Sequence, residues 1–320
     1  MLEKLMEYNS VQRVILFLQK HQAFDSNQNW FDFLRLYIPR VTDNDTSERA
    51  ASAAYSLILA VFPAVIFLFT LIPMIPIPDL EDQVMDFFSQ VLPASTYDTV
   101  KTTIYDIISR PRGNVLSFGF ILALYAATNG ILSLMMAFNS SHTTGRRGFF
   151  KTRLIALGLT LMLAFALFLA IAVLVIGGVI TDYLQHIQIL DNIVVTTLLN
   201  VARYLVVFAV FVAAISVIYK FGPDIDKHWK FVNPGGVIAS VLVVLTTYGF
   251  SYYVSNFGSY NKLYGSIGTL IVLMIWINLV CLLLIIGFDM NVVLYRKGNK
   301  PSKPGDKTIN APQTAREHLQ

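Results

Sequence analysis

Four polar side chains of this sequence stand inside long apolar stretches, where they could bind or position a charged group. Arg203 lies about ten residues into one stretch, and Asn200 lies about one helical turn before it. Asn129 and Asn278 hold comparable places in two other stretches. A charge in hydrocarbon is costly unless a partner or water solvates it. Two interpretations of Arg203 are open: a structural charge satisfied by Asn, Tyr or backbone carbonyls, and an anion-binding group in a hydrated cavity shared with Asn129 or Asn278.

Asp289 is the one carboxylate within these stretches, and its position sets it apart from Arg203. At the rise of an α-helix it lies about 34 Å from the outer end of its stretch, too far to pair with Arg203. We interpret it as a helix-end carboxylate near Arg296 and Lys297. For Asn129 and Asn278, the alternative to a ligand-binding role is hydrogen bonding between helices.

The residues that would support hydrolytic or metal chemistry do not form a recognisable set. No pair of histidines has the spacing of metal ligands, and the sequence has no Walker-type phosphate loop and no nucleophile elbow. A nuclease would need a general acid and base or metal ligands gathered at one site. We therefore expect no enzyme activity, no cofactor, no metal and no nucleic-acid partner. The five histidines are scattered over loops and tail, at His21, His142, His186, His228 and His318.

Composition identifies the elements that carry these side chains. Hydrophobic residues make up 55% of the 320 residues and charged residues 14%, a balance that a soluble domain could not place on its surface. We expect an all-α, polytopic integral membrane protein, with an outward-facing amphipathic helix pair at residues 76–113. Six transmembrane helices are predicted at about 50–75, 114–139, 154–180, 193–219, 235–257 and 266–294.

Lys and Arg in the connecting segments predict the orientation. Nineteen lie in the N-terminal region, the two loops on the same side and the tail, against four on the opposite side, and Arg203 completes the 24. Both termini are therefore expected in the cytoplasm. Residues 1–49 form an amphipathic region that either lies at the membrane interface or covers the cytoplasmic helix ends. The transmembrane domain covers residues 50–295, and the basic tail 296–320 is expected to be disordered.

The stretch from Tyr219 to Leu294 contains the densest set of Gly, Pro, Tyr and Asn positions. Its two apolar runs are predicted to form an antiparallel pair, joined by a tight polar loop from Gly258 to Ser266. The loop's tyrosines would lie at the outer headgroup level. For the glycines of the chain, close helix packing or turns are favoured over gating.

These residues, in this order, resemble the YihY/BrkB family of bacterial inner-membrane proteins, some of which have carried the label ribonuclease BN. The resemblance covers roughly residues 40 to 296, and it implies a multi-pass protein of the bacterial cytoplasmic membrane. One departure stands at Gly287-Phe288-Asp289, where the family usually has Gly-Ala-Glu. The matching positions are Pro63, Asn139, Pro223, Pro234, Gly235, Tyr260, Asn261, Tyr264, Gly265, Gly268, Trp276, Gly287 and Asn291, with Asp289 in place of the Glu.

Two functions from different classes fit these features. The first is a transporter or flippase-like protein for an amphipathic, anionic envelope lipid or related solute. The second is a non-transporting scaffold, with envelope-assembly proteins as partners. Membrane lipids would be partners in both cases. Arg203 distinguishes them, because a scaffold does not need a solvated charge within the membrane. No ATPase motif is present, so pumping would need an ion gradient or a partner.

Overall fold

The computed structural model contains α-helices and no strands in the part of the chain that it describes. The described residues are 9–71 (without 25 and 27), 113–139, 147–186, 193–224, 230–256 and 258–295, with 82, 85, 86, 101, 102 and 105 between them. The helices are α2 (Asn9–Lys20), α3 (Trp30–Val41), α4 (Asn44–Leu71), α7 (Gly113–Asn139), α8 (Phe149–His186), α9 (Ile193–Phe221), α10 (Pro234–Asn256) and α11 (Gly258–Leu294).

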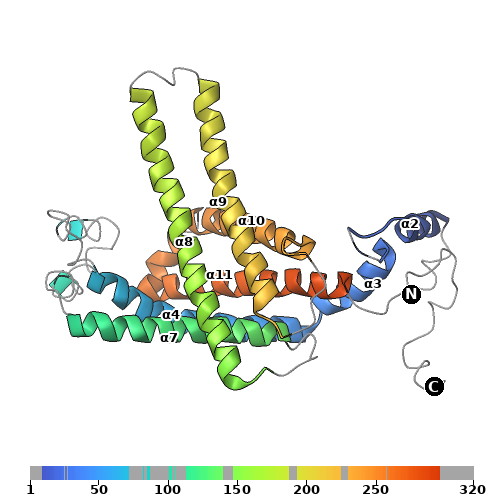
Figure 1. Ribbon diagram of the computed structural model, residues 1–320, viewed down its shortest axis with the longest axis horizontal. Helices are drawn as coiled ribbons and strands as arrows, with labels where there is room; N and C mark the ends of the chain where they lie inside the picture. Colours follow the sequence, from blue (N-terminus) through green and yellow to red (C-terminus); the bar gives the residue numbers. More distant parts are fainter. Residues whose placement is uncertain are drawn as a thin grey trace.

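The helices fall into two groups that cross. In Figure 1, α4, α7 and α11 run alongside one another, whereas α8 and α9 form a hairpin that crosses them and projects beyond them. Helix α11 contacts α3, α4, α7 and α10, while the hairpin packs mainly against α7 and α10 and reaches α11 through Tyr219. The stretch that the sequence singled out therefore supplies the central helix of the fold.

The expected all-α membrane fold is confirmed. Five described helices are long and apolar enough to cross a membrane, with apolar segments in α7, α8, α9, α10 and α11. The first predicted span corresponds to α4, which continues through Pro63. The outward amphipathic pair at 76–113 and the tail 296–320 lie almost entirely outside the described residues. The count of six spans remains a prediction.

The predicted loop from Gly258 to Ser266 is wrong. Helix α11 begins at Gly258 and is 37 residues long, so this polar segment forms its first turns. Hydropathy marks where a helix can lie in hydrocarbon, and a helix can extend beyond that limit with polar residues. Helices α10 and α11 run in opposite directions (Figure 1).

The N-terminal region covers the end of α11. Phe33 of α3 is buried against Met290, Val293 and Leu294 of α11. The Gln28 amide, just before α3, donates to the carbonyl of Val293 at 2.9 Å. Of the two interpretations of this region, the structure favours the second for α3, which covers the end of a long helix.

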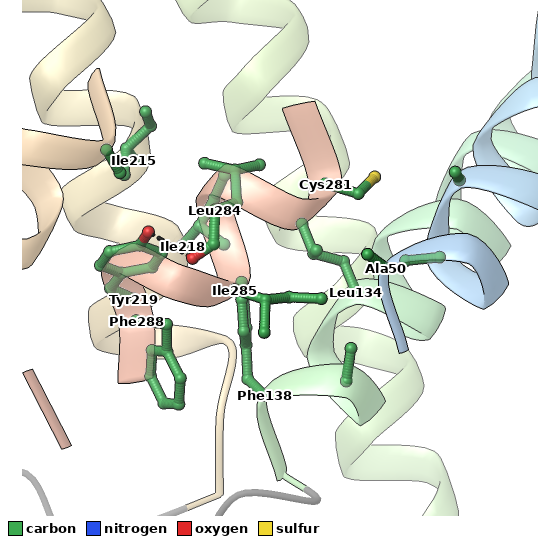
Figure 2. Close-up of a cluster of buried hydrophobic side chains, with 14 of the residues drawn as sticks. Ala50, Leu134, Phe138, Ile215, Ile218, Tyr219, Cys281, Leu284, Ile285 and Phe288 are labelled. Atoms are coloured by element: carbon green, nitrogen blue, oxygen red, sulfur yellow. Dashed lines mark hydrogen bonds between the residues drawn. The ribbon is translucent and has the colours of Figure 1, made fainter. Parts of the chain in front are cut away.

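The largest hydrophobic core lies where the ends of α4, α7, α9, α10 and α11 meet. Figure 2 shows Tyr219, Phe138 and Phe288 within it, with the Tyr219 hydroxyl donating to the Leu284 carbonyl at 2.6 Å. The rings of Phe138 and Phe288 lie 4.6 Å apart, centroid to centroid. Phe288, which stands where the family usually has Ala, thus packs against another aromatic ring in this core.

Candidate functional site

Arg203 lies between the two helices of the hairpin. It is half-buried and about 15 Å from the start of α9, and it faces two glycines of α8. A Cβ on Gly177 would lie 2.8 Å from the Arg203 Cδ, so the glycine makes room for this side chain. The guanidinium donates to the Leu174 carbonyl at 3.5 Å and lies 5.2 Å from the ring centroid of Tyr204. Its Nε is buried without a hydrogen-bond partner among the described residues, and no described carboxylate pairs with it.

Asn129 does not join Arg203 in a common site, which corrects one predicted arrangement. The Asn129 Oδ1 accepts a hydrogen bond from Arg153 Nη1 at 2.6 Å. Arg153 stands 24 residues before Gly177 on α8, which corresponds to about 36 Å along that helix. Because the hairpin crosses α7, the first turns of α8 lie beside the middle of α7. The sequence placed Arg153 in a cytoplasmic loop and so missed this contact.

The other two predicted asparagines remain candidates on separate helices. Asn278 is half-buried on α11, and its Oδ1 accepts no hydrogen bond from the described residues. Asn200 is half-buried on α9, three residues before Arg203 and therefore on the same side of the helix. No described contact joins Asn278 to Arg203.

Asp289 is buried near the C-terminal end of α11, with 1% of its side chain exposed. Its carboxylate lies 3.5 Å from Arg49 Nη2 of α4 and 3.8 Å from Arg40 Nη1 of α3. Arg49 also donates to the Ala137 carbonyl of α7 at 3.0 Å. The predicted partners, Arg296 and Lys297, lie outside the described residues. We call Asp289, Arg40 and Arg49 the carboxylate cluster; the acid pairs with arginines of α3 and α4, and Arg49 extends the contact to α7.

Two asparagines and two glycines join the start of α10 to the end of α11. The Asn291 Oδ1 accepts from the Gly235 backbone N–H at 2.9 Å, and its Nδ2 donates to Asn233 Oδ1 at 2.5 Å. Asn233 caps α10 by accepting from the Gly236 N–H at 2.8 Å. A Cβ on Gly235 would collide with the Gly287 carbonyl oxygen. Glycine at both positions thus permits the two backbones to approach, and Pro234 occupies the first helical position.

A second ionic contact fixes the segments beside this end. Arg147 Nε lies 3.0 Å from Asp224 Oδ1, and the guanidinium donates to the carbonyls of Phe221, Gly222 and Pro223. The Asp224 N–H donates to Asn139 Oδ1 at 2.6 Å. Arg147 thus caps the end of α9, and Asn139 connects the end of α7 to the segment that follows α9.

The remaining family-motif positions have less specific surroundings. Trp276 Nε1 donates to Thr247 Oγ1 of α10 at 3.2 Å. Gly268 is buried in α11. Tyr260, Asn261, Tyr264 and Gly265 are helical, and their side chains lie outside what the structure describes. Among the described residues, no group of three His, Cys, Asp or Glu side chains could hold a metal ion.

An all-α fold with several membrane-length apolar helices, joined at one end by buried polar contacts, defines a multi-pass membrane protein. Comparison with known families makes the assignment specific. The chain belongs to the family described as "Virulence factor BrkB", whose sequence model matches residues 37–310.

Curated relatives agree with this assignment. The chain is 31% identical to the "Putative ribonuclease-like protein YfkH" of Bacillus subtilis, over 85% of this chain and 98% of that protein. It is 25% identical to a UPF0761 membrane protein of Psychrobacter sp., over 87% of this chain and 50% of that protein. A UPF0761 membrane protein of Vibrio cholerae is 28% identical over 36% of this chain and 38% of its own length. No solved structure matches the chain.

Proposed function

We propose that this membrane protein binds an anionic, amphipathic envelope lipid and moves it across the bilayer. The observation that carries the proposal is Arg203, a half-buried cation on an apolar hairpin with no carboxylate partner among the described residues. An arginine in hydrocarbon costs about 2.5–3.5 kcal/mol on insertion scales. The contacts of Arg203 with one carbonyl and one ring leave donors for the oxygens of an anionic headgroup.

The proposal can be tested by lipid translocation in proteoliposomes. Fluorescent phosphatidylglycerol serves as the anionic lipid, phosphatidylcholine carrying the same fluorophore as the neutral lipid, and dithionite quenching reports movement between leaflets. The wild-type protein is expected to speed the movement of phosphatidylglycerol above that in protein-free vesicles. Arg203→Lys should keep part of this activity, because charge remains while bidentate geometry is lost. Arg203→Leu should abolish it.

A matched control uses the same helix. Leu205 is 61% exposed on α9, so Leu205→Ala removes apolar surface without touching the charge. It is expected to translocate like the wild type. Failure of the wild type to move phosphatidylglycerol, or full activity of Arg203→Leu, would overturn the proposal and favour the envelope-assembly scaffold.

We also propose that the protein has no nuclease activity of its own, although its relative YfkH is named ribonuclease-like. Asp289, the buried carboxylate of α11, is paired with two arginines. Purified protein should leave RNA intact in the presence of Mg²⁺ or Mn²⁺. Cleavage that co-elutes with the folded protein and disappears in Asp289→Asn would contradict this.

We propose that the protein lies in the bacterial inner membrane and that both of its termini are in the cytoplasm. The positive charges of the connecting segments support this. The core supports it too, because the N-terminal end of α4 packs there with the C-terminal ends of α7, α9 and α11. Helices that cross a bilayer in opposite directions place opposite ends on the same side. Labelling of single cysteines placed at residue 95 should occur from outside intact cells. Labelling only after lysis would refute this orientation.

A further inference from the structure

Arg153 has surroundings unlike those of the other arginines near this end of the helices. Arg40, Arg49 and Arg147 each lie within 4 Å of a carboxylate oxygen. Arg153 pairs with no carboxylate of the described residues, and its polar partners are the neutral side chains of Asn129 and Tyr125. Its charge is therefore held in place without being neutralised.

Aromatic rings complete the support of this guanidinium. Its central carbon lies 5.2 Å from the ring centroid of Tyr125 and 5.9 Å from that of Phe149. The Tyr125 side chain also interacts with both Asn129 and Arg153. Aromatic faces attract a guanidinium and fix the orientation of its plane, but they leave its N–H groups free to donate hydrogen bonds. Its hydrogen-bond partners are the Asn129 amide and the Tyr125 hydroxyl, so several of its five N–H groups remain available.

The surface around Arg153 is apolar and open. Phe150 is 86% exposed and Leu154 is 70% exposed, on the same helical turns as Arg153. The apolar segment of α8 begins at Phe149, which places Arg153 about 6 Å inside that segment. A cation at this depth, beside exposed apolar side chains, fits the level at which phospholipid phosphates meet the hydrocarbon of a bilayer.

We propose that Arg153, Asn129 and Tyr125 form a binding site for the phosphate of an anionic phospholipid at the base of the α8–α9 hairpin. The guanidinium binds two phosphate oxygens through parallel N–H groups. The Asn129 amide fixes the guanidinium, and the Tyr125 hydroxyl supplies a further donor. Phe149 and Phe150 contact the acyl chains. The site shares with the proposed function only the class of ligand, and it lies about 36 Å along α8 from Gly177, the residue beside Arg203.

Binding and translocation can be measured separately. Native mass spectrometry of the full-length protein in detergent, titrated with phosphatidylglycerol or phosphatidylcholine, counts the lipids that stay bound. We expect the wild type to retain phosphatidylglycerol over phosphatidylcholine. Arg153→Gln should weaken phosphatidylglycerol binding roughly tenfold, the usual contribution of a hydrogen bond to a charged group. Lys151→Gln removes the same charge two residues away, from an exposed position, and should have little effect.

Asn129→Asp separates ligand binding from a structural role. The new carboxylate accepts the same hydrogen bond from Arg153 and neutralises its charge, so the contact between α7 and α8 is preserved. Unfolding temperature should be unchanged or raised, while phosphatidylglycerol binding falls as in Arg153→Gln. This variant remains informative if Arg153→Gln does not fold.

Three results would overturn the site: unchanged phosphatidylglycerol binding in stable Asn129→Asp, an equal loss in Lys151→Gln, or competition by inorganic phosphate at the lipid's own concentration. The last result would identify a free phosphate site instead. If the binding results hold while the vesicles show no translocation, the lipid site stands and the proposed transport fails. If translocation depends on Arg203 while Asn129→Asp binds lipid normally, the proposed transport stands and the lipid site fails.

Discussion

Removing the carboxylate of Asp289 should destabilise the protein more than any other single change in the carboxylate cluster. Asp289 is 1% exposed and lies 3.5 Å from Arg49 and 3.8 Å from Arg40. Asp289→Ala leaves the Arg49 guanidinium, itself 13% exposed, without its buried counter-charge. Removal of one partner of a buried ion pair costs roughly 3–5 kcal/mol, because the other charge remains desolvated.

The two arginines should differ in their effects. Arg40 is 30% exposed, so solvent screens its interaction, and Arg40→Ala should cost at most about 1 kcal/mol. Arg49→Ala should approach the effect of Asp289→Ala, because it also removes the bond to the Ala137 carbonyl. A useful control is Asp45→Ala. Asp45 pairs with Arg49 at 3.1 Å but is 62% exposed, so its loss should cost about 0.5 kcal/mol.

The single cysteine provides the assay. Cys281 is fully buried in the main core, so a thiol-reactive coumarin maleimide reports its exposure on heating in detergent. By the usual conversion for domains of 150–250 residues, Asp289→Ala should lower the apparent melting temperature by roughly ten degrees. Asp289→Asn, which keeps the shape and one acceptor, should lower it less.

Two outcomes would refute this reasoning. One is an Asp289→Ala melting temperature within two or so degrees of the wild type. The other is a larger loss for Arg40→Ala than for Arg49→Ala. A double-mutant cycle of Asp289 and Arg49 should give a coupling of about 0.5–3 kcal/mol, the range for residues in direct contact.

Three further predictions follow from neighbouring contacts. Gly235→Ala should cost about 1–3 kcal/mol and lower the melting temperature, because its Cβ would collide with the Gly287 carbonyl, whereas an alanine at the open Gly249 should not. Arg147→Ala should increase protease cleavage of the segment before α8, because it removes the contacts with the end of α9. Burial, and secondarily the charge of Asp289, raise the pKa of Tyr37 from 10.0 to about 12. The protonated Tyr37 therefore contributes to the free energy of unfolding fully below pH 10, and this contribution is lost as pH rises towards 12. Tyr37→Phe should remove this part of the loss of stability at alkaline pH, which is measured as the melting temperature at a series of pH values.

Much of the fold could be predicted from hydropathy. Helices α7, α9 and α10 lie within a few residues of their predicted spans, because apolar runs of this length have few alternatives to a helix. Prediction failed where polar residues continue a helix, as at Gly258. It could not show that the hairpin crosses α7, because crossing depends on packing between helices and not on the pattern within one.

That crossing explains which part of the candidate site was missed. A single sequence assigns Asn129 a depth along its own helix but does not say which residue faces it, and the facing residue is Arg153. Asp289 presents the same problem, since its partners come from α3 and α4, about 240 residues earlier in the chain. The family motifs indicated that the end of α11 was specific. They could not show that Phe288 packs against Phe138.

Variants of the carboxylate cluster and variants of Arg203 should therefore differ in melting temperature and in translocation. The carboxylate cluster connects helices, so Asp289→Ala should lower the melting temperature whatever the ligand. Arg203 lies on a hairpin where it has no carboxylate partner among the described residues, and Arg203→Leu removes an insertion cost of about 2.5–3.5 kcal/mol without breaking an ion pair. Its melting temperature should be unchanged or higher while translocation is lost. If Arg203→Leu instead melts as low as Asp289→Ala, Arg203 is a structural charge satisfied by carbonyls and rings, and the transport proposal loses its main support.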